Sequence, residues 1–116
     1  MSIEDVQRWP ASLLDIELCL LMGAEEDKHR PGRVMYGDKS MFPKTYSTDI
    51  SNAREAQAKA IELDAIMYLK QLSASVSNQS YEQVQEYDLI QLIEVVRLLQ
   101  ATPRQIAEAA YLTLKG

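Results

Sequence analysis

The sequence predicts an all-α protein, a compact bundle of about four helices that forms a single domain over residues 1–116. Apolar residues recur at helical spacing along most of the chain, and helix-start signals precede those stretches. No run of alternating residues is long enough to predict a strand. The predicted helices span residues 12–22, 49–74, 81–100 and 103–114, with a long irregular loop at 24–47.

The first predicted helix is apolar on nearly every side. The Ser12 hydroxyl can cap it, Asp15 completes a capping box three residues later, and Gly23 provides the stop. A helix that is apolar all round must be covered on most sides, so we expect it at the centre of the core. Before it, residues 2–9 are predicted to form a short amphipathic turn that ends at Pro10.

The second predicted helix, residues 49–74, carries two apolar stripes and starts at Thr48 or Asp49 as its cap. Small alanines near its start allow a neighbouring helix to approach closely. The first stripe holds Ala53, Ala56, Ala60, Leu63 and Met67, and the second holds Ile61, Ala65, Tyr68 and Leu72.

The third predicted helix, residues 81–100, starts at a capping box made by Ser80 and Gln83. Its polar positions form one narrow strip, and all its other residues from Leu89 to Leu99 are Leu, Ile or Val. Such a helix needs contacts around most of its circumference, more than a monomer of this size supplies. We therefore expect a homo-oligomer, a dimer in the simplest case, with an interface at Leu89, Leu92, Ile93, Val96 and Leu99.

The last predicted helix, residues 103–114, has the clearest start signals. Thr102 is its cap, Pro103 takes the first helical position, and Gln105 completes a capping box. Its inward-facing residues are predicted to be Ile106, Ala107, Ala110, Tyr111 and Leu114.

Charge and composition bear on compartment and partners. The net charge of −5 argues against bulk attraction to nucleic acid or to an anionic membrane. The single cysteine, Cys19, excludes an intramolecular disulfide, and no apolar stretch approaches the roughly 20 residues of a membrane span. We therefore expect a cytoplasmic protein without membrane contact.

The loop at 24–47 departs from this acidic background. Five basic residues against one acid give residues 28–44 a net charge of +4, which leaves −9 for the rest of the chain. Aromatic residues are interleaved with these cations, and loops of this length are usually functional or disordered. The predicted partner-binding residues are Lys28, His29, Arg30, Arg33, Tyr36, Lys39, Phe42, Lys44 and Tyr46.

Three interpretations of this loop stay open. Arginine and aromatic residues are enriched at protein interfaces, which favours a protein partner. Cations beside planar rings also suit phosphate contacts and base stacking, which favours a nucleic acid. In the third interpretation, Tyr36, Met41 and Phe42 pack on the core and the cations pair with the acids at 25–27.

Catalytic signals are weak. The single histidine and single cysteine are ten residues apart, which does not match the spacing of a zinc or haem site. His29 lies among charged residues, and the helical carboxylates do not form the paired clusters that hold Mg²⁺. We predict no catalytic residue, metal or cofactor, and expect a non-catalytic interaction module: an adaptor, regulatory subunit or small inhibitor. The alternatives are a nucleic-acid-associated regulator acting through residues 28–46 and, more remotely, a Mg²⁺-dependent nucleotide hydrolase.

Overall fold

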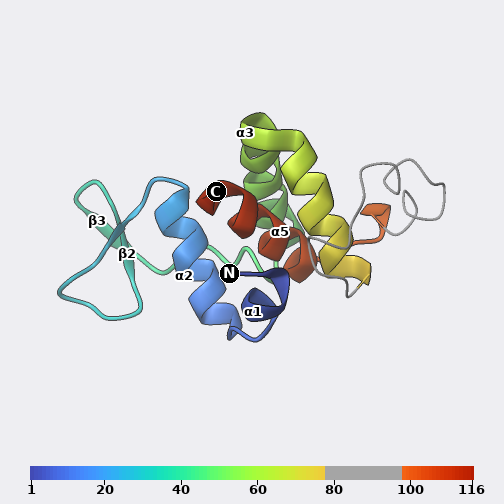
Figure 1. The fold of residues 1–116 in the computed structure, drawn as a ribbon. Helices are drawn as coiled ribbons and strands as arrows, with labels where there is room; N and C mark the ends of the chain where they lie inside the picture. The colour runs from blue at the N-terminus through green and yellow to red at the C-terminus, as the bar shows by residue number, and fades with distance from the viewer. Residues whose placement is uncertain (78–97) are drawn as a thin grey trace.

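A computed structural model describes residues 1–77 and 98–116 as a mostly helical globule with a small antiparallel sheet at one end (Figure 1). Its elements are α1 (Ile3–Gln7), α2 (Ala11–Leu21), β1 (Glu25–Glu26), β2 (Val34–Tyr36), β3 (Lys39–Met41), α3 (Ile50–Ser77) and α5 (Pro103–Lys115). The helical prediction is confirmed in this coarse form, but a purely all-α fold is wrong because residues 24–47 hold three strands. Most of the predicted helix at 81–100 lies outside the described residues.

Helix α5 occupies the centre of the fold. It packs most extensively against α3 and also contacts α1 and α2 (Figure 1). Eight consecutive residues, 106–113, are buried in α5, whereas α2 leaves Leu13 and Leu21 more than a third exposed. The prediction that residues 12–22 form the central helix is therefore wrong. The start signals of α5 are confirmed, since Thr102 and Gln105 form the capping box ahead of Pro103.

The start of α2 differs from its prediction. The helix begins at Ala11 with Pro10 at the cap position, and no side chain caps it. Asp15 does not bond back to Ser12. Instead the Asp15 carboxylate is buried and accepts a hydrogen bond of 2.9 Å from the backbone N–H of Ser47, which joins α2 to the segment before α3. The predicted stop is confirmed, because Gly23 adopts a φ of 109° directly after the helix.

Helix α3 is not continuous. At Asp64 the backbone is extended, with φ −160° and ψ 90°, and the two halves fold back on each other (Figure 1). The Gln57 side-chain amide donates to the Tyr68 hydroxyl over 2.8 Å. In a straight helix these residues would lie about 16 Å apart along the axis, at 1.5 Å per residue. Residues 50–77 therefore form a helical hairpin.

This break explains which predicted stripe positions are buried. Ala53, Ala56 and Ala60 are completely buried, as predicted for close helix packing. Leu63 was predicted on the same stripe but is 62% exposed, because the stripe ends where the helix turns. Tyr68 and Leu72, in the second half, are buried as predicted.

A partly buried ion pair joins three helices. The Arg104 guanidinium donates from Nε to Glu108 over 2.8 Å, and its NH2 group donates to the backbone oxygens of Val6 and Trp9. The Ser75 hydroxyl donates to the other Glu108 oxygen over 2.8 Å. This network ties α1 and α3 to α5, and it satisfies the carboxylate that α5 buries.

The N-terminal segment packs on the same helix. Residues 2–9 were predicted to form a short turn, and they form α1, with Ser2 and Asp5 as its capping box. The Trp9 ring meets the Tyr111 ring edge-on, with centroids 5.0 Å apart. This geometry is favourable for aromatic pairs and fixes the end of α1 against α5.

Candidate functional site

The cationic segment is built on a three-stranded antiparallel sheet in the order β1-β2-β3. Strands β2 and β3 form a hairpin in which Tyr36 pairs with Lys39 across a two-residue turn. Gly37 opens that turn with a φ of 64°, the left-handed conformation that two-residue hairpin turns require. The hairpin lies beyond α2, at the opposite end of the molecule from α3 (Figure 1).

The loop between β1 and β2 is organised by Asp27, which is buried. Its Oδ1 accepts the backbone N–H groups of His29 and Arg30 at 3.0 and 3.1 Å, and its Oδ2 accepts the Ser40 hydroxyl. The Ser40 hydrogen bond, the two backbone donors and the Arg30 charge hold the pKa of Asp27 below its ordinary value of 3.8. Asp27 therefore fixes the backbone from which the predicted cations project.

Arg33 connects this network to the surface. Its Nε and NH2 groups donate to the hydroxyl and carbonyl oxygens of Ser40, both at 2.9 Å. The same guanidinium lies 4.3 Å from the centre of the Phe42 ring, which is 74% exposed. Arg33 is thus held in place by the hairpin and forms a cation–π platform with Phe42 that faces solvent.

Four predicted partner-binding residues are exposed: Lys28, His29 and Arg30 in the loop between β1 and β2, and Lys39 at the start of β3. Within residues 1–77 and 98–116, none of their side chains forms an ion pair or a hydrogen bond. Lys44 is exposed too, but its ammonium group pairs with Glu55 at 3.0 Å. We call Lys28, Arg30, Arg33, Lys39 and Phe42 the hairpin surface.

Two predicted partner-binding residues do not join that surface. Tyr46 is buried to 1% exposure, and the Tyr36 hydroxyl is also buried. Burial, reinforced by the neighbouring Cys19 thiol, raises the pKa of Tyr36 to about 12 and raises the pKa of Tyr46 as well. Tyr46 is therefore too deeply buried to contact a partner in this fold, which corrects its prediction. Tyr36 is partly buried against the core with its hydroxyl inward, and its predicted role at a partner contact stays a prediction.

The third interpretation of the loop is correct for Tyr36 but not for its neighbours. Met41 is 46% exposed and Phe42 more so, although both were expected to pack on the core. The Asp27 carboxylate accepts hydrogen bonds from the backbone of the loop and from Ser40.

The predicted oligomer interface lies mostly outside the described residues. This holds for Leu89, Leu92, Ile93 and Val96, while Leu99 is 79% exposed.

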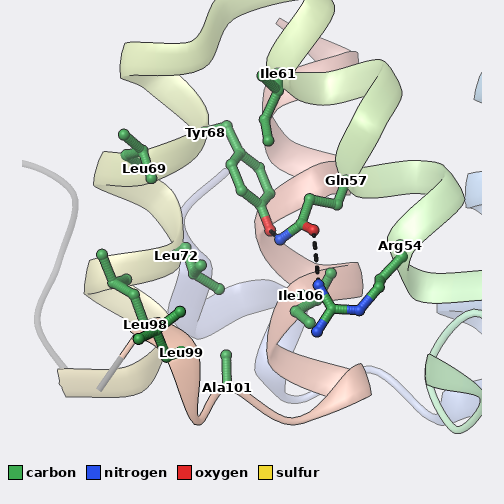
Figure 2. Close-up of a pocket in the computed structure, with 10 residues that line it drawn as sticks. All are labelled: Arg54, Gln57, Ile61, Tyr68, Leu69, Leu72, Leu98, Leu99, Ala101 and Ile106. Atoms are coloured by element: carbon green, nitrogen blue, oxygen red, sulfur yellow. Dashed lines mark hydrogen bonds between the residues drawn. The ribbon is translucent and has the colours of Figure 1, made fainter. Parts of the chain in front are cut away.

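A second candidate site is a cavity of about 350 Å³ between the two halves of α3 and the start of α5 (Figure 2). Its polar edge consists of Arg54, Gln57 and Tyr68. Its apolar wall consists of Ile61, Leu69, Leu72, Leu98, Leu99, Ala101 and Ile106.

The polar edge is a directed chain of hydrogen bonds. Arg54 donates to the Gln57 side-chain oxygen over 3.4 Å, and the Gln57 nitrogen donates to the Tyr68 hydroxyl oxygen over 2.8 Å (Figure 2). Burial raises the pKa of Tyr68 to about 12, against smaller lowering effects of the Gln57 bond and the Arg54 charge. Tyr68 therefore keeps its proton at neutral pH.

This cavity does not follow from the prediction of residues 49–74 as one continuous helix, because the chain folds back at Asp64. The spacing of Arg54, Gln57 and Ile61 does place a cation and an amide on one helical face with an apolar residue. That spacing was the available signal for the polar edge. No comparable signal brought Tyr68 to Gln57, since that contact exists only because the chain turns at Asp64.

Other chemical features of the described residues are sparse. Across residues 1–77 and 98–116, no group of three or more His, Cys, Asp or Glu side chains is arranged to hold a metal ion. None of the helices in those ranges is both long and apolar enough to cross a membrane. No family model, curated protein or solved structure matches this chain.

Proposed function

We propose that this protein is a non-catalytic interaction module that contacts a protein partner through the hairpin surface. The observation that carries the proposal is the set of exposed cations at 28, 30 and 39, which form no ion pair within the described residues, together with the Arg33–Phe42 pair on the same sheet. Arginine and aromatic side chains dominate binding hot spots, and a fixed arginine loses less conformational freedom on binding than a mobile one.

The charge pattern supports an acidic partner surface. The cations belong to the one strongly basic segment of a chain with net charge −5. Complementary charge raises association rates and orients partners, while its effect weakens as salt screens it. An adaptor, regulatory subunit or small inhibitor is the kind of protein that uses such a surface.

A nucleic acid is less well supported as the partner. Base stacking needs exposed rings, and two of the three aromatic residues predicted for it, Tyr36 and Tyr46, serve to anchor the hairpin. Phe42 remains exposed, but Arg33 already covers one part of it. The hairpin surface therefore suits a protein better than a run of stacked bases.

The test is a quantitative capture from the native host extract. The bait proteins are the unchanged chain, the double variant Arg30→Glu, Lys39→Glu, and the control Lys59→Glu. Lys59 is an exposed lysine of α3 with a weak 3.9 Å contact to Glu62. All three should give the same helical circular dichroism, because the replaced side chains are exposed.

We expect one or more proteins to be retained by the unchanged chain and by Lys59→Glu, and to fall at least about tenfold with the hairpin variant. Such a loss corresponds to a hot-spot contribution of about 1.4 kcal/mol or more. An identical captured set for all three baits contradicts the proposal. Loss of capture after nuclease treatment, with a steep dependence on salt, would show that the hairpin surface binds a nucleic acid instead of a protein.

A further inference from the structure

We propose that the cavity between the two halves of α3 and the start of α5 binds a small monocarboxylate with a short apolar tail. This proposal does not depend on the hairpin surface, which lies at the other end of the molecule (Figure 1). It rests on three features of the cavity: a guanidinium at its edge, a fixed hydroxyl donor and an apolar wall (Figure 2).

The cation is Arg54. The acidic neighbours on its helix are engaged elsewhere, since Glu55 pairs with Lys44 at 3.0 Å and Glu62 lies 3.9 Å from Lys59. Among the described residues that line the cavity there is no aspartate or glutamate. A guanidinium is a fork of N–H donors that matches the two oxygens of a carboxylate. The charge of the cavity thus favours an oxyanion over a cation.

The hydroxyl donor is Tyr68, which is 1% exposed. Its oxygen accepts from Gln57, and within the described residues its own proton has no acceptor. Because Arg54 in turn fixes the Gln57 amide, the Tyr68 hydroxyl is oriented before any ligand arrives. A buried donor without an acceptor is costly, so the cavity should favour a ligand that supplies an acceptor atom.

The wall fits the tail of such a ligand. Of the apolar lining residues, Leu72 and Ile106 are each 3% exposed, while Ile61 and Leu99 are 45% and 79% exposed. Those two residues leave apolar surface in water that a hydrocarbon chain would cover. The volume of about 350 Å³ lies at the small end of ligand pockets, which indicates a short-chain ligand over a large cofactor.

The test is isothermal titration calorimetry of the full chain with octanoate, hexanoate and octylamine. We expect one saturable octanoate site per chain and no octylamine site, since the amine reverses the charge. Each added methylene should tighten the dissociation constant about fourfold, so hexanoate should bind more than tenfold weaker than octanoate.

Variants identify the site. Arg54→Gln, which keeps a polar side chain, should weaken octanoate binding about tenfold, and Tyr68→Phe should weaken it several-fold. Lys59→Gln, on the same helix but outside the cavity, should leave the affinity unchanged. The proposal is overturned by a lack of saturable binding up to about 10 mM octanoate, by equal binding of octylamine, or by unchanged affinity in Arg54→Gln.

Discussion

Arg104 and Glu108 form a 2.8 Å ion pair one turn apart on α5, with the Glu108 side chain only 4% exposed. Arg104→Ala would leave that buried carboxylate with the Ser75 hydroxyl alone, and would remove the donors to the carbonyl of Val6 in α1 and the carbonyl of Trp9 just after it. We expect a loss of about 3 kcal/mol in the free energy of unfolding. Urea denaturation measures it, with Lys59→Ala as a control that changes stability by less than about 0.5 kcal/mol. Equal stability of the two variants would show that the network is dispensable.

The environment of Asp27 predicts that the stability of the hairpin depends on pH. Its folded pKa is lowered, chiefly by the Ser40 hydroxyl, so its stabilisation is complete above the ordinary value of 3.8. That stabilisation is lost as the pH falls through the lower folded value. We expect Ser40→Ala to raise the pKa of Asp27, measured by an NMR titration of the His29 and Arg30 amides, which bond to its Oδ1.

The matched control for that titration is Ser51→Ala, which removes an exposed serine hydroxyl at the start of α3. It should leave the midpoint of the Asp27 titration where it is in the unchanged chain. A midpoint that moves equally in Ser40→Ala and Ser51→Ala would refute the role given to Ser40.

The turn within α3 depends on Asp64 as a helix cap. Its Oδ1 accepts the backbone N–H of Met67 over 3.0 Å, which satisfies one free donor at the start of the second half. Asp64→Ala should lower the free energy of unfolding by about 1 kcal/mol, whereas Asp64→Ser should retain most of it. Thermal denaturation followed by circular dichroism compares the two. A serine variant as unstable as the alanine variant would argue against capping.

Substitutions at Gly37 test the backbone conformation of the hairpin turn. Its φ of 64° lies in the left-handed region, and open space surrounds the position where a side chain would begin. Gly37→Val should therefore cost about 1 kcal/mol through backbone strain alone, with Gly37→Asn nearly neutral. Hydrogen exchange of the β2 and β3 amides should be about fivefold faster in the valine variant only. Equal exchange in the two variants would rule out strain as the cause.

The sequence predicted the elements whose signals are local. Thr102, Pro103 and Gln105 define the start of α5 through contacts among neighbouring residues, and all three behave as predicted. Thr48 or Asp49 was predicted as the cap of the next helix, and it is the Asp49 Oδ1 that accepts the N–H groups of Ser51 and Asn52. Caps of this kind need no tertiary information.

The failures concern contacts between distant parts of the chain. Asp15 fits a capping box in sequence, but its carboxylate bonds to Ser47, 32 residues away. The hairpin carried a local signal in Gly37-Asp38, a favourable two-residue turn, but its strands have only three residues each. Strands that short do not establish an alternating pattern.

The candidate sites also contain features that local sequence predicts and features that depend on tertiary structure. Charge singled out Lys28, Arg30 and Lys39 as partner-binding residues, and the structure leaves them exposed because burial of an unpaired lysine or arginine is costly. Composition did not separate the exposed Phe42 from the buried Tyr46, since both rings alternate with cations. Their separation follows from sheet register and from how the chain leaves β3 for α3, which are tertiary properties.

The edge-on contact between Trp9 and Tyr111 gives the molecule a built-in reporter. Trp9 is the one tryptophan of the chain, so intrinsic fluorescence excited at the red edge originates where α1 meets α5. The emission spectrum therefore follows the docking of the N-terminal helix separately from events in the hairpin. A shift of that spectrum before the loss of helical signal would identify α1 as the first part of the fold to separate.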